Sequence, residues 1–184
     1  MDFNKLVKSI VEPVLLFFGF AIKQDIKGII EYDYKVFVIT LSYDYSTSYE
    51  VDVTLLFKES GLFYGYNELK QYFYNSKPNL LATQIKDENT LTKWLEEVNN
   101  FLKENLSSII DNYKEVQIGL ERIRQHQIDN YESERNNRLL NEGVERYWMV
   151  KDYSGLVNFL KNKGELVGSV KKKYEFALKM IKEK

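Results

Sequence analysis

The chain has 184 residues, of which 44% are hydrophobic and 29% are charged, a composition that is ordinary for a globular protein. It contains no cysteine, which excludes disulfide bonds, a thiolate nucleophile and cysteine-based zinc sites. The net charge of −1 hides an uneven distribution: up to Asp111 there are 11 lysines and 16 acidic residues, and beyond it there are 10 lysines, 5 arginines and 11 acidic residues. This difference predicts two structural units, one acidic and one mildly basic.

The apolar runs and the first residues indicate the compartment. No apolar run approaches the roughly 20 residues that cross a bilayer. Near Met1, no cleavage site of small residues follows an apolar core, so a signal peptide is not predicted. We therefore expect a cytoplasmic protein without a membrane partner.

The first segment has the spacing of a helix that leads into two strands. Asp2 is placed to cap the helix, and apolar residues then recur at helical intervals. Pro13 should kink or restart this helix, because proline has no N–H to donate. Gly19 is expected to end it. Residues 20–26 and 29–34 then predict two strands.

Residues 35–58 form the clearest element, a hairpin on which the rest of the first unit is expected to pack. Between residues 49 and 58 apolar and polar side chains alternate strictly, which is typical of a strand with one solvated face. Between residues 35 and 43 apolar side chains occupy both faces, which predicts a central strand. The short polar run 44–48 suits a hairpin loop.

Shorter elements are predicted after the hairpin. Gly61 and Gly65 bracket a short edge strand, and Asn67 is expected to cap a helix over residues 68–74. Residues 80–85 favour a strand.

A strong amphipathic helix follows, capped by Asp87 or Asn89. Its apolar residues form a single stripe that begins at Leu91. We expect a break near Ser107–Ser108, after which the same rhythm continues to Ile123.

The last third of the chain reads as helical. Residues 124–138 are almost entirely polar and form either a solvated helix or a linker, and three apolar stripes follow. The predicted fold is α+β: an antiparallel sheet of four to five strands packed against helices, followed by a C-terminal helical segment. The predicted domains are an α+β domain over residues 1–123, the polar segment 124–138 and a helical hairpin over residues 139–184.

Motifs that usually mark enzymes are missing from the sequence. There is no glycine-rich phosphate-binding motif. The one histidine, His126, lies in a polar stretch, where an exposed surface histidine is expected. We therefore predict no cofactor, no metal and no catalytic residue.

Carboxylates provide the one catalytic alternative. Metal-dependent nucleases combine acids on neighbouring strands with a lysine that orients water. Two sets of residues fit this pattern loosely: Asp25, Asp33 and Lys35, and Asp52, Glu68 and Lys70. Acids on a strand more often form its solvated face. A metal-dependent hydrolase or nuclease is therefore the alternative function.

Tyrosines are a more informative surplus, since the chain has 14 of them. Tyrosine is common at protein interfaces because it offers a large area, a polar atom and few rotamers to restrict. We predict a partner-binding surface near the tip of the hairpin and in the segment after it, made by Tyr43, Tyr45, Tyr49, Tyr64 and Tyr66.

Lysines form a basic face at the C-terminus, beginning with the run 171–173. Such a face can neutralise phosphates. However, Glu175 and Glu183 interrupt it, and nucleic-acid-binding domains are generally more basic than this one. We expect no nucleic-acid partner, and a homodimer through Trp148 and its neighbours is a further hypothesis.

Both ends of the chain carry a resemblance. The opening V-E-P-V-L-L-F-F-G-F, followed by strands, resembles bacterial domains of unknown function in which a helix ending in Gly-Phe leads into an antiparallel sheet. The closing stretch, from Tyr147 through residues 151–153 to residues 173–177, resembles the helical pair that ends some of those proteins and looks somewhat like a single tetratricopeptide-type hairpin. Some of these relatives are immunity proteins, which neutralise a toxin by binding it. The resemblance implies a fold and a protein partner, and it carries no catalytic residue.

These observations favour a non-enzymatic protein-binding module of the kind of a bacterial immunity or accessory protein. Its partner would be another protein, such as a toxin. An acidic first unit suits a basic partner, because complementary charge speeds capture.

Overall fold

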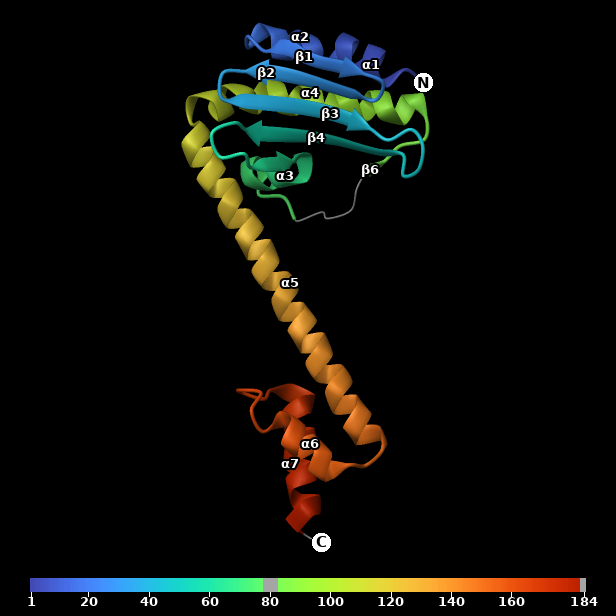
Figure 1. The fold of residues 1–184 in the computed structure, drawn as a ribbon, viewed down its shortest axis with the longest axis vertical. Helices are drawn as coiled ribbons and strands as arrows, with labels where there is room; N and C mark the ends of the chain where they lie inside the picture. The colour runs from blue at the N-terminus through green and yellow to red at the C-terminus, as the bar shows by residue number, and fades with distance from the viewer. Residues whose placement is uncertain (78–82, 183–184) are drawn as a thin grey trace. The chain divides into compact units, whose positions relative to one another are not determined.

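The computed structural model describes residues 1–77 and 83–182 and confirms the predicted α+β fold (Figure 1). The chain forms two compact units, residues 1–125 and residues 126–184. The boundary falls inside a single helix, α5 (Tyr113–Met149), slightly beyond the predicted end of the first domain. The predicted polar segment 124–138 is helical throughout.

An antiparallel sheet organises unit 1, the residues up to Gln125. Its strands are hydrogen-bonded in chain order: β1 (Ala21–Ile26), β2 (Ile29–Tyr34), β3 (Phe37–Tyr43), β4 (Glu50–Phe57) and β5 (Phe63–Gly65). A further short strand, β6 (Thr83–Gln84), pairs with the start of β4. The hairpin is confirmed, and β3 lies at the centre, as its apolar residues on both faces predict.

Alternation along the strands divides the sheet into a core face and an outer face. On the core face the register pairs Leu41 with Val53, and both side chains are buried. On the outer face it pairs Ser42, which is half-buried, with Asp52, which is exposed. The strict period of two in β4 therefore follows from burial on one side only.

The edge strand β1 is exposed at all its residues. Its register with β2 shifts between Ile22 and Gln24, and the residues around this bulge include the charged Lys23 and Asp25. A bulge and charges on an edge strand discourage pairing with another chain. This edge is therefore poorly suited to strand addition.

Five helices share the core with the sheet: α1 (Phe3–Ile10), α2 (Glu12–Phe17), α3 (Tyr66–Tyr74), α4 (Glu88–Asp111) and the start of α5, through Val116 and Leu120. Asp2 caps α1 by accepting from the N–H of Lys5 at 3.1 Å. Pro13 lies in the first turn of α2, so the helix restarts there as predicted. Asp87 caps α4 through the N–H of Thr90 at 2.8 Å.

Two predicted helix boundaries were wrong. Helix α3 begins at Tyr66, and its N-cap is Gly65 rather than Asn67, because the side chain of Glu68 accepts from the N–H of Gly65 at 2.9 Å. The break between α4 and α5 falls at Asn112 instead of Ser107–Ser108. Burial of Ile109 at 1% exposure holds the preceding turn in the helix despite its serines.

Unit 2, residues 126–184, consists of the later part of α5 with α6 (Tyr153–Leu160) and α7 (Gly168–Lys182). Few hydrophobic side chains are buried among its residues up to Lys182: Val144, Leu156, Leu160, Val170 and Ala177. Asp152 opens α6 by accepting from the N–H of Gly155 at 2.8 Å.

Two further predictions concern the described part of the chain. Residues 80–82 of the predicted strand over 80–85 lie outside the described residues, whereas residues 83 and 84 form β6. Among the described helices, none is long and apolar enough to cross a membrane.

Candidate interaction surface

Three of the predicted partner-binding tyrosines lie near the loop that joins β3 to β4. Tyr43 is buried at 5% exposure, and its hydroxyl donates to the carbonyl of Ile85 at 2.9 Å. Tyr45 is half-buried, with its ring 4.5 Å from that of Tyr43 and its hydroxyl accepting from the N–H of Phe3 at 3.1 Å. Tyr49 remains 38% exposed. Of these three, only Tyr49 is exposed.

The other two tyrosines are core residues. Tyr64 is 0% exposed and Tyr66 is 4% exposed, and the Tyr66 ring packs edge-on against Trp94 and Phe101. Burial raises the pKa of the Tyr66 hydroxyl, with Glu97 adding to the effect. The prediction that Tyr43, Tyr64 and Tyr66 lie at the surface was therefore wrong. Strand alternation directs Tyr43 and Tyr64 into the core, and Tyr66 is buried at the start of α3.

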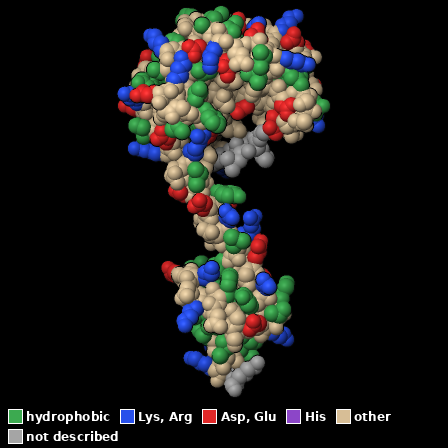
Figure 2. All heavy atoms as spheres, in the orientation of Figure 1, with side chains coloured by type: hydrophobic (Ala, Val, Ile, Leu, Met, Phe, Trp, Pro, Cys, Tyr) green, Lys and Arg blue, Asp and Glu red, His purple; other side chains and the backbone are tan. Residues whose placement is uncertain are grey.

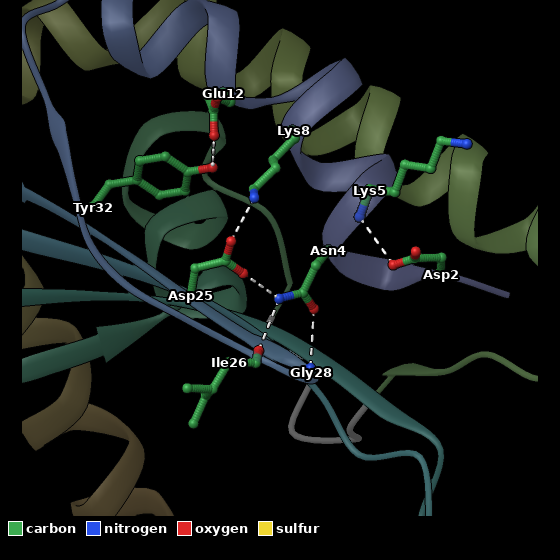
Figure 3. A network of polar contacts seen from close by, with 9 residues as sticks. All are labelled: Asp2, Asn4, Lys5, Lys8, Glu12, Asp25, Ile26, Gly28 and Tyr32. Atoms are coloured by element: carbon green, nitrogen blue, oxygen red, sulfur yellow. Dashed lines mark hydrogen bonds and ion pairs between the residues drawn. The ribbon is translucent and has the colours of Figure 1, made fainter.

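Asp25, the first residue of one predicted metal set, belongs to a polar network between α1 and the turn after β1 (Figure 3). The amide of Asn4 donates to Asp25 at 2.7 Å and to the carbonyl of Ile26 at 2.8 Å, and it accepts from the N–H of Gly28 at 2.9 Å. Lys8 forms an ion pair with the same carboxylate. Hydrogen bonds from Lys8 and Asn4 hold the pKa of Asp25 below its ordinary value. This carboxylate fastens the helix to the turn.

The rest of that metal set points elsewhere. Asp33 forms an ion pair with Lys58 at 2.7 Å, and the ammonium of Lys35 lies 5.4 Å from the centre of the Tyr34 ring. Over residues 1–77 and 83–182, no group of three or more acidic or histidine side chains is placed to hold a metal ion.

In the second predicted metal set, Asp52, Glu68 and Lys70, the glutamate binds an arginine, a contact that the sequence did not reveal. The Nε and Nη2 atoms of Arg124 each lie 2.8 Å from an oxygen of Glu68, and Nη2 donates to the carbonyl of Phe63 at 2.7 Å. The guanidinium also lies 4.4 Å from the centre of the Tyr64 ring. Lys70 pairs with Glu97 at 3.0 Å instead of facing this group. Glu68 is therefore an anchor for α5, held by the two-pronged geometry that arginine favours.

Nothing local in the sequence predicts this anchor, because Glu68 and Arg124 are separated by 56 positions. The hydrogen bond to Glu68 raises the pKa of Arg124. The arginine is only 32% exposed and the glutamate 18%, so the pair is more protected than a typical surface ion pair.

Asp52 stands apart from the other candidate acids. Its side chain is exposed on the outer face of the sheet, yet surrounding protein atoms remove enough water to raise the pKa of its carboxyl. The N–H groups of Val53 and Tyr66 oppose this shift, and the charge of Glu68 adds to it. Among the described residues, neither Asp52 nor its neighbour Glu50 has an ion-pair partner.

A shallow hollow of about 290 Å³ lies on this outer face, where β2, β3 and β4 meet the hairpin loop. Polar residues in its lining include Ser42, Ser48, Glu50 and Asp52. On the face of unit 1 that Figure 2 shows, acidic and basic side chains are interspersed. The carboxylates in the lining of the hollow, those of Asp44, Glu50 and Asp52, make it negatively charged.

The loop at the rim of the hollow is held by Asp44. Both carboxylate oxygens accept hydrogen bonds from backbone or hydroxyl groups of Ser46, Thr47 and Ser48, at distances from 2.6 to 3.3 Å. These bonds, the one from the Thr47 hydroxyl first, hold the pKa of Asp44 below its ordinary value. Tyr49 follows the loop with a left-handed φ of 55°. The loop is thus ordered by its own side chains.

The remaining predicted features are exposed. His126 lies on the surface of α5, with its Nδ1 2.9 Å from the side-chain nitrogen of Asn130. Within the C-terminal lysine run, Lys173 pairs with Glu145 and lies 5.3 Å from the Trp148 ring, whereas Lys171 and Lys172 are exposed.

Comparisons of the chain with protein-family models, with curated proteins and with solved structures find no match. The resemblance of the two ends of the chain to immunity proteins therefore stays a prediction.

Proposed function

We propose that this chain is a non-enzymatic protein-binding module that captures a basic partner protein on the outer face of its sheet, in the manner of a bacterial immunity or accessory protein. The observation that carries this proposal is the pair of carboxylates of Glu50 and Asp52 at the polar hollow, which have no ion-pair partner among the described residues. Asp52 accepts from backbone N–H groups, which carry no full positive charge. A charge that is partly removed from water and has no partner lowers the stability of the folded protein. A cationic side chain of a partner would supply the missing counter-charge.

The surroundings of the hollow support the same use. Tyr49 lies beside Glu50 in the chain and is exposed, and its ring is 5.6 Å from the ammonium of Lys86. Aromatic residues are enriched among those that dominate binding energy at interfaces. The Asp44 hydrogen bonds order the loop before any partner arrives, which reduces the entropy lost on binding.

The hydrolase alternative has less support. Of its candidate ligands, Asp25, Asp33 and Glu68 are each committed to an ion pair with a lysine or an arginine. Asp52 alone remains without such a partner in the described part of the chain.

Affinity capture from an extract of the source organism tests the proposal. The full chain is compared with E50K/D52K, which reverses the charge at the hollow, and with E59K/E96K, which makes the same change in charge at two exposed acids outside its lining. We expect one basic protein to be retained by the wild type and the control and to be lost, by about a hundredfold in affinity, from E50K/D52K. Binding of the purified partner should weaken as salt is raised.

Two results would contradict the proposal. One is retention of the same partner by E50K/D52K with unchanged affinity. The other is the absence of any specifically retained protein.

A further inference from the structure

Within unit 2, helix α5 has two opposite faces. Leu140, Val144, Tyr147 and Trp148 belong to the face that packs with α6 and α7 in the core of the unit. At about 100° of rotation per residue, seven other residues fall in an arc of about 80° on the opposite side. All of them are exposed: Ile128, Tyr131, Arg135, Leu139, Glu142, Arg146 and Met149. We call these seven residues the outer stripe.

The outer stripe is unusually apolar for a helix surface that faces solvent. Its four apolar members, Ile128, Tyr131, Leu139 and Met149, are between 45% and 79% exposed. The members of the stripe follow one another at steps of three and four residues, which is the spacing of helix-to-helix contacts. A row of large apolar side chains at this spacing marks an interaction surface.

The outer stripe is complementary to a second, antiparallel copy of itself in the placing of its charged and apolar side chains. Reversal about the point between residues 138 and 139 brings Ile128 opposite Met149 and Arg135 opposite Glu142. It also brings Tyr131 opposite Arg146, an aromatic ring against a guanidinium, which attract each other. Leu139 lies next to the reversal point and therefore meets its own counterpart.

We propose that the outer stripe binds a second copy of this chain, with the two α5 helices antiparallel and related by a two-fold axis near Leu139. Each contact then occurs twice, as a two-fold interface requires. Arg135 pairs with Glu142 of the second copy, and Glu142 pairs with Arg135 of the second copy. Glu142 is free to do so, since its contact with Arg138 is an exposed pair at 4.0 Å that contributes little.

The contact extends over about 33 Å of helix. A single pair of helices of this length buries less area than a standard stable interface, so the association is concentration-dependent. The proposal is independent of partner capture by unit 1, because all seven residues belong to unit 2.

Charge reversal tests the pairing. In R135E two glutamates face each other at each contact, and in E142R two arginines do, so each variant should associate at least about tenfold more weakly than wild type. Combining both changes in one chain, R135E/E142R, restores opposite charges and should restore association. E134R is the matched control, since Glu134 is exposed on α5 and lies outside the outer stripe. Sedimentation equilibrium over a wide range of concentration measures each association, and circular dichroism checks that helix content is unchanged.

A cysteine reporter tests the position of the axis, since the chain has no cysteine of its own. L139C should form disulfide-linked dimers on mild oxidation, whereas N137C, an exposed position off the outer stripe, should not.

The proposal is overturned if wild type sediments as a monomer at every concentration. It is also overturned if a dimer forms that R135E and E142R leave unchanged, or if R135E/E142R stays as weak as the single variants. A dimer that L139C fails to cross-link under oxidation would equally exclude the antiparallel axis.

Discussion

The two units of this chain are stabilised in different ways. Unit 1 buries residues from the sheet and from helices on its core face, whereas the buried hydrophobic residues in the described part of unit 2 are Val144, Leu156, Leu160, Val170 and Ala177. Small units bury a smaller fraction of their surface and are correspondingly marginal. In unit 2, rings that are only half-buried or exposed, such as Trp148 and Phe176, supply much of the packing. The difference suggests that unit 1 behaves as a robust scaffold, whereas unit 2 depends on individual contacts.

The largest expected effect is in the core of unit 1. Leu41 is 0% exposed, and L41A should lower the free energy of unfolding by about 2–5 kcal/mol through lost burial and a cavity. Chemical denaturation, monitored by hydrogen exchange in unit 1, measures this change in the free energy of unfolding. L16A, at a leucine that is 50% exposed, is the control and should change stability by less than about 0.5 kcal/mol. Similar losses in both variants would show that the core is not where the structure puts it.

Removal of the arginine anchor should come next. R124M leaves Glu68 without its two-pronged partner and should cost about 1–3 kcal/mol, because among the described residues the half-buried carboxylate then keeps only the N–H of Gly65. R122M changes an exposed arginine on the same helix and serves as the control. Hydrogen exchange of α3 and β5 should increase in R124M alone, and equal exchange in the two variants would argue against the anchor.

Two glycines of α5 allow the units to be compared directly. An added Cβ would lie 2.1 Å from the Tyr72 ring at Gly119 in unit 1 and 2.3 Å from the Phe159 ring at Gly143 in unit 2. Each ring must therefore move in G119A or G143A, at a cost of about 1–3 kcal/mol. Replacing glycine by alanine in a helix gains about 1 kcal/mol in helix propensity. The cost of moving the ring equals or exceeds this gain.

Substitution of each glycine should change hydrogen exchange in its own unit alone. We expect G119A to increase hydrogen exchange only in unit 1 and G143A only in unit 2, where the smaller core should make the local effect larger. Shortening the opposing ring, in G119A/Y72L and G143A/F159L, should recover part of the loss. If the single alanine variants are more stable than wild type, the close approach of the rings is wrong.

A smaller effect is expected at the start of α6. D152A removes the side chain that accepts from the N–H of Gly155 and should cost unit 2 about 1 kcal/mol. D152N and D152S keep a capping oxygen and should retain most of the stability. Hydrogen exchange of α6 distinguishes these variants, and equal loss of protection in all three would point to a role other than capping.

The smallest predicted effect depends on pH and concerns the hollow. Because the pKa of Asp52 is raised in the folded state, ionising this carboxyl costs stability as pH rises through its folded pKa. D52N should therefore be slightly more stable than wild type at pH 7 and equal to it near pH 3, where both states are protonated. D33N is the comparison, since it loses the ion pair with Lys58 and should gain nothing at pH 7. If D52N gains stability but loses the captured partner, Asp52 serves binding at the expense of stability.

Local periodicity was enough to predict much of unit 1. The alternation in β4, the apolar faces of β3, the cap at Asp2 and the restart at Pro13 are all properties of a few neighbouring residues, and all are found in the structure. The predictions that failed depended on competition between local signals. Asn67 is a good N-cap by itself, but Gly65 takes that position because the Glu68 side chain reaches back to its N–H.

Local sequence patterns predicted the candidate site less well than they predicted the fold. Tyrosine content predicted an interface, yet Tyr43, Tyr64 and Tyr66 are buried, since a tyrosine can fill a core as readily as a surface. Which acids lack a partner also depends on contacts between distant positions: Asp25 with Lys8, Asp33 with Lys58 and Glu68 with Arg124.

The sequence by itself therefore determined the elements, their order, the α+β class and the charge of each half, because these depend on neighbouring residues and on composition. Only the tertiary structure decided which tyrosines are buried, which carboxylates at the hollow lack an ion-pair partner among the described residues, and which side of α5 faces solvent within unit 2. The physical reason is that burial and ion pairing are set by groups far apart in the chain, which no local pattern records.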